Sequence, residues 1–140
     1  MTFIDTTLRP ERAVWPAMKR GMAGRCPACG EGRLYGKYLK VNENCPACGE
    51  ELHHHRADDA PPYLVIVIVG HLMVGIVLHM EMVVRIPAMY YLAVVLPITV
   101  LLSLWLLPIV KGAIIGMQWA KYMHGFDPRG PDDDVEGGRA

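Results

Sequence analysis

The chain has 140 residues, 52% of them hydrophobic, and its 14 basic side chains balance 14 acidic ones to a formal net charge of zero. A chain of this length can form one or two small domains and is too short for a large enzyme domain. The balanced charge leaves no basic footprint for nucleic acid, and we expect no such partner. The hydrophobic residues gather in two long runs after residue 59, a pattern typical of a membrane protein.

Residues 1–24 are basic and are interrupted by proline and glycine. They contain neither the apolar core nor the small-residue cleavage site of a signal peptide, so we expect this end to stay in the cytosol. We interpret the segment as a solvated basic arm. The alternative is that Trp15, Met18 and the basic side chains lie on an anionic lipid surface.

The sequence CPACG occurs twice, at residues 26–30 and 45–49. Two residues separate the cysteines of each copy, so both sulfurs of a copy can turn onto one ion. Gly30 and Gly49 follow where a tight turn often needs a positive φ. The segment between the copies alternates apolar and polar side chains, which predicts a short hairpin. The pattern predicts a zinc ribbon over residues 25–52. Its four thiolate ligands are Cys26, Cys29, Cys45 and Cys48.

Three kinds of site remain open for these cysteines. Zinc suits four thiolates, iron in a rubredoxin-like site is the next alternative, and disulfides are disfavoured in the cytosol. A closed four-cysteine site has no open coordination position for a substrate. The expected Zn²⁺ is therefore structural, and it replaces the core that so short a segment cannot build.

Two uncharged apolar runs, residues 60–80 and 86–110, are each long enough to cross a bilayer as a helix. Because backbone groups in lipid must be satisfied within the segment, we predict transmembrane helices over residues 63–84 and 87–110, joined by a tight turn. Nine Lys and Arg residues precede the first run, Arg85 lies between the runs, and four follow the second. The positive-inside rule then places both termini in the cytosol.

Residues 111–125 predict an amphipathic helix, with Ile115 and Trp119 on its apolar face. This helix either continues the second transmembrane helix into the cytosol or lies at the membrane interface. Residues 126–140 are acidic and rich in glycine and proline, and we expect disorder there. The predicted fold class is a membrane α protein. A small cytosolic zinc ribbon with short β-strands precedes a two-helix transmembrane hairpin, and the amphipathic helical extension follows it.

Residues 53–62 crowd titratable side chains between the ribbon and the first apolar run. A helix would begin near the two aspartates, where carboxylates cap free amides. The histidines have either a docking role or ligand chemistry, since a paired histidine and aspartate can bind metal or move a proton. The candidate functional residues of this junction are His54, His55, Arg56, Asp58 and Asp59.

His71 lies inside the first predicted transmembrane helix, between Gly70 and Gly75, and small residues favour close helix contact. We expect a neutral imidazole bonded to Thr99 or Ser103 of the second helix, with a functional role as the alternative. Imidazole and thioether groups at the outer end of the helix are candidate copper ligands. They are His79, Met80 and Met82.

The string CPACGEGRLYGKYLKVNENCPACG, followed by HHRADDAPPYLVIVIVGH, resembles a bacterial membrane-protein family known as domain of unknown function 983. The family pattern is a pair of C-P-x-C-G knuckles, then H-H-R-A-D-D-A-P-x-Y, then a membrane segment containing G-H. The resemblance is strong over residues 25–71 and extends to the second helix by hydropathy. It singles out Cys26, Cys29, Cys45, Cys48, His54, His55, Arg56, Asp58, Asp59, Pro61, Tyr63, Gly70 and His71.

The resemblance also implies a gene placed beside genes for cytochrome oxidase subunits and assembly factors. We therefore expect a non-enzymatic accessory protein of the bacterial inner membrane, which contacts membrane lipids and a membrane-protein partner such as a terminal oxidase. The ribbon would be its docking module. One alternative is haem or copper handling in oxidase maturation. Another is a membrane enzyme that uses interfacial His and Asp, although the sequence has no nucleophile elbow, phosphate loop or open metal motif.

Overall fold

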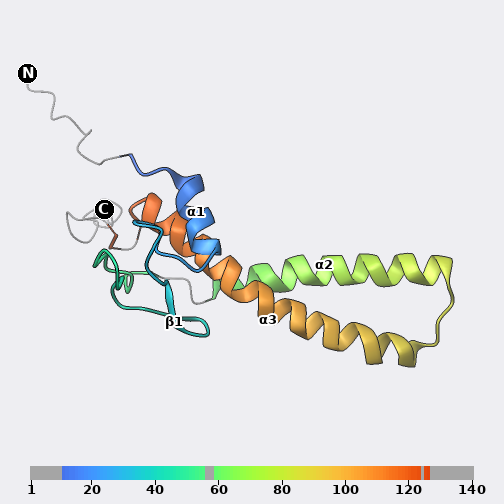
Figure 1. Ribbon diagram of the computed structural model, residues 1–140. Helices are drawn as coiled ribbons and strands as arrows, with labels where there is room; N and C mark the ends of the chain where they lie inside the picture. The colour runs from blue at the N-terminus through green and yellow to red at the C-terminus, as the bar shows by residue number, and fades with distance from the viewer. Residues whose placement is uncertain (1–10, 56–58, 124, 127–140) are drawn as a thin grey trace, which may run out of the picture.

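The computed structural model describes residues 11–55, 59–123 and 125–126. The elements in chain order are α1 (Val14–Met22), β1 (Tyr35–Lys37), β2 (Lys40–Val41), α2 (Ala60–Val83) and α3 (Ala88–Ala120). Figure 1 shows α2 and α3 running back along each other as a long rod, while the other elements gather at one end. We call this end the head; it comprises residues 11–55, 111–123 and 125–126.

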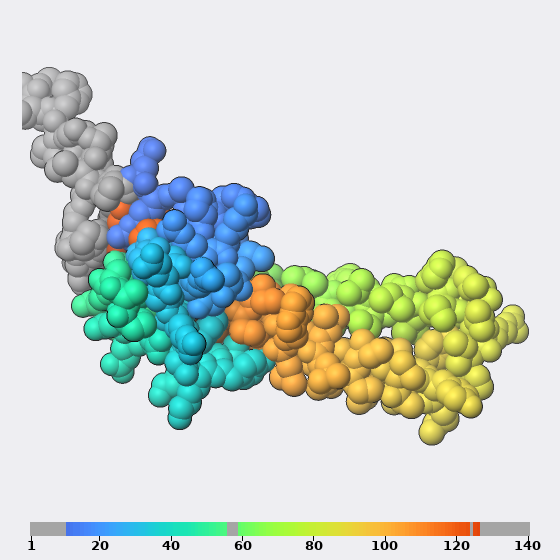
Figure 2. Space-filling model, in the orientation of Figure 1, coloured from blue at the N-terminus to red at the C-terminus, as the bar shows by residue number. Residues whose placement is uncertain are grey.

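The rod consists of α2 and residues 88–110 of α3, and we call it the helical hairpin. Both helices are long and apolar enough to cross a membrane, and the most apolar 18 residues of each have mean hydropathies of 2.3 in α2 and 2.5 in α3. Only 11% and 0% of their most apolar windows are buried within the molecule, so their apolar side chains face outward. Figure 2 shows this narrow rod projecting from the thicker head. The predicted pair of long apolar helices is thus present, starting at Ala60 and Ala88.

The local sequence explains where these two helices begin and end. Pro61 and Pro62 occupy the first turn of α2, where a missing N–H costs nothing because that amide has no helical partner. Val84 is extended, and Pro87 precedes the first residue of α3, so the connection is short. α3 has 33 residues and α2 has 24, a difference of 33 − 24 = 9. At about 1.5 Å per residue, α3 is longer than α2 by about 14 Å.

This extra length carries α3 into the head as one unbroken helix. Of the two alternatives for residues 111–125, continuation of the second long helix is therefore correct as far as Ala120. Ile115 is fully buried, and Trp119 donates from Nε1 to Glu50 Oε1 at 2.9 Å. The buried cluster of the head draws on both the ribbon and the chain around the end of α3. Its members are Cys26, Leu34, Cys45, Leu52, Ile115 and Phe126.

Phe126 corrects the expected boundary of the acidic tail. It is only 4% exposed and packs in the core of the head, so disorder beginning at residue 126 is wrong at that position. The physical reason is its large apolar ring, whose burial stabilises the folded chain by about 2 kcal/mol. Residues 127–140 lie outside the described residues.

The basic arm is also different from the prediction. Residues 14–22 form α1, which packs across the end of α3 (Figure 1), so the predicted solvated arm is wrong there. A side chain at Gly112 would overlap the Gly21 carbonyl, and one at Gly116 would overlap the Ala17 carbonyl. The two backbones are therefore in direct contact, which only very small residues allow.

Arg12 accounts for one of the basic charges in this region. Its guanidinium lies 4.1 Å from the ring centroids of both Trp119 and Tyr122, and it donates to the Trp119 carbonyl at 3.0 Å. Cation–π contacts of this kind contribute about 0.5–2 kcal/mol. The charge thus holds the chain leading into α1 against the end of α3 instead of remaining solvated.

The strand hairpin β1–β2 docks on α3 beside Pro108, a proline inside the helix. Pro108 has no N–H, so the Leu104 carbonyl loses its usual helical donor. The Tyr38 hydroxyl donates to that carbonyl, and the Tyr35 hydroxyl donates to the Pro108 carbonyl at 2.8 Å. Lys111 Nζ in turn donates to the Leu39 carbonyl at 2.8 Å. The ribbon therefore supplies a hydrogen bond that the helix itself cannot make.

We expect Tyr38→Phe to weaken this docking, because it leaves the Leu104 carbonyl without a donor. The free energy of unfolding of the purified protein in detergent should fall by about 0.5–1.5 kcal/mol. Tyr63→Phe, at an exposed position on α2, is the matched control and should change it by less than about 0.5 kcal/mol. Equal stability of both variants and the wild type would show that the Tyr38 hydroxyl does not support docking.

Candidate metal centre

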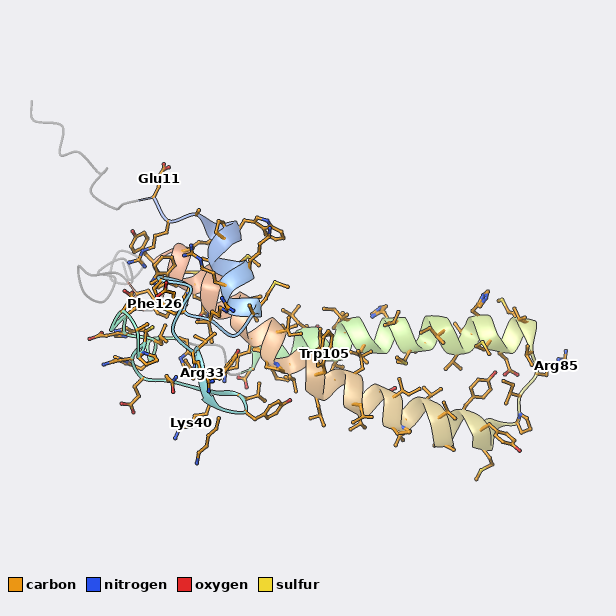
Figure 3. The ribbon with its side chains drawn as sticks, in the orientation of Figure 1. Glu11, Arg33, Lys40, Arg85, Trp105 and Phe126 are labelled. Atoms are coloured by element: carbon orange, nitrogen blue, oxygen red, sulfur yellow. The ribbon has the colours of Figure 1, made fainter. Side chains whose placement is uncertain are left out.

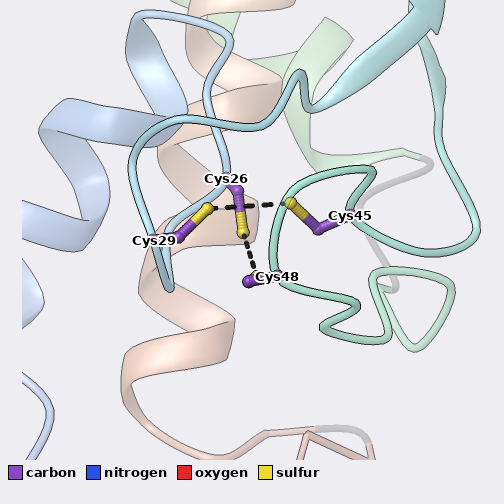
Figure 4. A group of neighbouring side chains, drawn as sticks. All are labelled: Cys26, Cys29, Cys45 and Cys48. Carbon is purple, nitrogen blue, oxygen red and sulfur yellow. Dashed lines mark hydrogen bonds between the residues drawn. The ribbon is translucent and has the colours of Figure 1, made fainter.

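Four cysteine sulfurs meet at the centre of the ribbon (Figure 4). The Sγ atoms of Cys26 and Cys48 are 3.8 Å apart, and those of Cys29 and Cys45 are 3.7 Å apart. All four sulfurs lie within 4.8 Å of one another, and all four cysteines are free. A tetrahedral ion with metal–sulfur bonds of about 2.3 Å requires sulfur–sulfur edges of about 3.8 Å. The residues present therefore fit a four-thiolate metal ion.

Each CPACG copy folds into the same knuckle. The Gly30 amide donates to the Cys26 carbonyl at 2.8 Å, and the Gly49 amide donates to the Cys45 carbonyl at 3.0 Å. Gly30 and Gly49 have φ values of 74° and 76°, which confirms the positive φ predicted from the sequence. A residue with a Cβ would be strained in that conformation. Repetition of the sequence thus produces two matching turns that present their sulfurs to one point.

Hydrogen bonds from backbone amides and burial shift the pKa values of the cysteine thiols in opposite directions. Hydrogen bonds from Gly32 and Glu31 lower the pKa of Cys29 to about 6, which favours its thiolate. Burial raises the pKa of Cys26 above the usual thiol value, and it does the same for Cys48. A bound cation would offset the effect of burial on these pKa values, because its positive charge stabilises the thiolate form.

The core of the head and α1 hold the two knuckles in place. Cys26 and Cys45 are buried in the core of the head. Arg20 of α1 donates to the carbonyls of Pro27 and Ala28 at 3.2 and 3.1 Å, so α1 braces the first knuckle. With four protein ligands, the ion would have no open position for substrate. The centre can hold the head together, but its donor set does not equip it to activate water.

The junction residues fall into separate environments. His54 Nε2 lies 2.7 Å from Glu51 Oε2, whereas His55 Nδ1 bonds the Leu52 carbonyl at 2.9 Å. Asp59 stands at the N-cap of α2 but makes no side-chain capping bond there, so the predicted cap is not formed by Asp59. Its backbone is already helical at φ −98° and ψ −28°, unlike the extended backbone of a typical cap. Arg56 and Asp58 lie outside the described residues.

His71 does not bond the second helix. Its Nδ1 lies 2.7 Å from the Val67 carbonyl of its own helix, and the ring is exposed on the hairpin. Thr99 and Ser103 likewise donate to carbonyls of α3, at 2.7 Å each. The predicted bond between the helices is therefore wrong, because the i−4 carbonyl is a nearer acceptor for each of these side chains.

The glycines beside His71 make no close contact between α2 and α3, and contact of this face with a partner's helix stays a prediction. Side chains built at Gly70 and Gly75 would meet no atom within 4 Å, so neither glycine lies in the contact between α2 and α3. The close contacts through glycine occur instead at Gly112 and Gly116. The spacing G-A-I-I-G was a usable signal for this contact, since two small residues four positions apart line one helix face.

The candidate copper ligands lie at the far end of α2. His79, Met80 and Met82 are all exposed on the hairpin. Within the described part of the chain, neither His71 nor His79 belongs to a group of three or more potential His, Cys, Asp or Glu ligands. Copper binding by His79, Met80 and Met82 stays a prediction.

A family model described as "Protein of unknown function (DUF983)" matches residues 35–119. The chain belongs to this family. The match spans 119 − 35 + 1 = 85 residues and runs from β1 through both long helices to the part of α3 that lies in the head. It begins after the first knuckle, so Cys26 and Cys29 precede the matched segment. No curated protein and no solved structure matches the chain.

Proposed function

We propose that the protein is a non-enzymatic accessory protein of the bacterial inner membrane. A head built around zinc would stand on the cytosolic end of a two-helix transmembrane hairpin and dock a membrane-protein partner there. The observation that carries this proposal is the attachment of the four-cysteine ribbon to α3, through Tyr35, Tyr38 and Lys111. A four-cysteine ribbon attached to a helix in this way can present a rigid docking surface to a partner, and its closed ligand set does not suit catalysis.

The outward-facing apolar side chains of α2 and α3 support membrane insertion. Ile66 and Leu101, for example, are 70% and 68% exposed within the molecule. Such faces are costly in water and favourable in lipid. Helices of this length need only their own backbone hydrogen bonds to cross the hydrocarbon layer.

The distribution of charge supports the orientation. Arg33 and Lys40 lie in the head, and Arg85 lies at the opposite end of the rod (Figure 3). Most Lys and Arg residues of the chain precede α2, and only Arg85 lies between the two long helices. By the positive-inside rule, the head then faces the cytosol.

Exposed aromatic rings at the base of the head support a lipid interface at that level. Trp105 is exposed on α3 within the last turns before the head (Figure 3), and Tyr38 is exposed on the ribbon beside it, bonded to Leu104. Tyr63 is exposed in the first turn of α2. Tryptophan and tyrosine favour the region of the lipid headgroups, where one part of the ring is apolar and the other is wet.

Zinc is the ion that we propose for the four-cysteine centre. The sulfur spacing and the short two-residue gaps suit a structural zinc ribbon, and four thiolates also accept iron. Elemental analysis of the purified protein separates the two metals. A colourless protein with zinc in the four-cysteine site supports the proposal, whereas iron with visible absorption in that site would contradict it.

The partner class that we propose is a terminal oxidase, on the strength of the gene association implied by the family resemblance. A deletion strain should therefore contain less assembled, haem-bearing oxidase, measured by reduced-minus-oxidised spectra of its membranes. The wild type and Ala47→Ser, an exposed change within the second knuckle, should restore it, whereas Cys26→Ser should not. Wild-type oxidase levels in the deletion strain would refute the oxidase assignment.

A second candidate function, metal handling during oxidase maturation, is favoured by one observation. Glu51, His53 and His54 gather on the surface of the head, apart from the four cysteines. A shared ligand set with His71 has less support, because His71 lies eleven residues into α2, about 17 Å along the helix axis from its start. A membrane enzyme is the third candidate, and no nucleophile or open catalytic motif in the sequence supports it.

A further inference from the structure

We propose that Glu51, His53 and His54 form a second metal site, which binds a divalent transition-metal ion such as Zn²⁺ or Cu²⁺. This site is separate from the four-cysteine centre and does not depend on the proposed accessory function. The ligand atoms of the three side chains all lie within 4.8 Å of one another. His54 Nε2 is 2.7 Å from Glu51 Oε2, and the rings of His53 and His54 lie with their centroids 4.0 Å apart, tilted by 38° to each other.

The three side chains need little movement to hold an ion. Bonds of about 2.0–2.2 Å to imidazole nitrogen and carboxylate oxygen place tetrahedral ligand atoms about 3.4 Å apart. Glu51 and His53 are exposed, so their side chains can rotate inward without disturbing the core. An ion would replace the hydrogen bond between His54 and Glu51, and both groups would keep a partner.

The second knuckle holds the backbone of this site. Glu51 pairs with Asn44 in an antiparallel bridge, just before Cys45. The amides of Leu52 and His53 both donate to the Glu43 carbonyl, at 2.8 and 3.2 Å. Ligands placed on a rigid element lose less entropy on binding than ligands on a free loop. The four-cysteine centre would thus position the second site.

The ring of His54 is oriented by the chain that follows α3. A Cβ at Gly125 would lie 2.9 Å from His54 Nδ1, and Gly125 has a φ of 95°, so only glycine fits there without strain. Phe126 meets the same ring edge-on, with centroids 5.9 Å apart. These contacts face one side of the imidazole, and Nε2 is turned toward Glu51. Contacts of this kind orient a metal ligand before the ion arrives.

The donor set distinguishes this site from the four-cysteine centre. Two imidazoles and one carboxylate favour zinc, copper(II) or nickel and leave at least one coordination position open. The four thiolates fill every position of a tetrahedral ion. We expect the second site to exchange its ion with solution, because it is exposed and has only three protein ligands.

His55 provides a matched control for the neighbouring histidines. Its Nδ1 bonds the Leu52 carbonyl, and it is outside the group formed by Glu51, His53 and His54. Replacing His55 removes the same chemical group one residue away and leaves the proposed site complete. A loss of metal caused only by fewer histidines would affect His55→Ala as much as His54→Ala.

The test uses the full chain in detergent, purified without a histidine tag and then loaded with excess Zn²⁺. Elemental analysis after equilibrium dialysis against a fixed concentration of free Zn²⁺ should find two protein-bound zinc ions per chain in the wild type and in His55→Ala. The double variant His53→Ala/His54→Ala should retain one. A mild chelator should remove the second ion first and leave the ion bound by the cysteines.

Two further measurements separate the proposed site from misfolding. Co²⁺ loading should give the same thiolate charge-transfer absorption in all variants, which shows that the four-cysteine centre is intact. Glu51→Gln should weaken the second site at least about tenfold in a zinc titration. The proposal fails if the wild type holds one ion only, or if the double variant with an intact cysteine centre still holds two.

Discussion

Cys26→Ser should abolish metal binding at the four-cysteine centre and unfold the head. Structural zinc in small sites contributes about 10–16 kcal/mol of apparent binding free energy, comparable with the whole stability of a domain of about 5–15 kcal/mol. Cys26 is fully buried in the core of the head, so the change also places an unpaired hydroxyl there. We therefore expect loss of the ion together with loss of protection of residues 11–55 against protease.

The control for this prediction is Ala47→Ser, which adds a hydroxyl at an exposed position of the second knuckle and leaves all four thiolates. It should keep the metal and the protease-resistant head. Circular dichroism should still show helix in Cys26→Ser, because α2 and residues 88–110 of α3 rely on their own backbone bonds. A Cys26→Ser protein with a full complement of metal and a resistant head would contradict the structural role of the centre.

Gly112→Leu should separate α1 from α3. Any Cβ at this position overlaps the Gly21 carbonyl, and a backbone atom cannot move aside as the end of a flexible side chain can. Overpacking at so close a contact costs about 1–3 kcal/mol or more. Because α1 also braces the first knuckle through Arg20, we expect the ion to be released faster to a chelator.

Gly75→Leu is the matched control, since a side chain at Gly75 meets no atom within 4 Å. Both changes place the same side chain in a helix and differ only in what surrounds it. Cysteine cross-linking between α1 and α3 reports the contact directly: the yield should fall in Gly112→Leu and stay at the wild-type level in Gly75→Leu. Equal cross-linking in the two variants would show that the glycine contact does not hold α1.

The four-cysteine cluster and the two long helices could be predicted because short stretches of sequence encode them. Two cysteines separated by two residues bring their sulfurs together within one turn, and the glycine after each pair allows the positive φ of that turn. Uncharged runs of more than 20 residues form helices wherever water is absent, whatever the rest of the chain does. The sequence by itself therefore determined the four-cysteine cluster, the helical pair and the family.

Only the tertiary structure decided how these parts join, because the contacts connect residues far apart in the chain. Tyr38 bonds a carbonyl released by Pro108, and Gly112 meets Gly21. His54 faces Glu51, not the helix that contains His71, because a turn held by Glu43 brings the two side chains together. Local periodicity carries no information on such pairings, since each depends on where a distant backbone lies. The end of α3 is the element that brings them together, and it completes the head around the four cysteines.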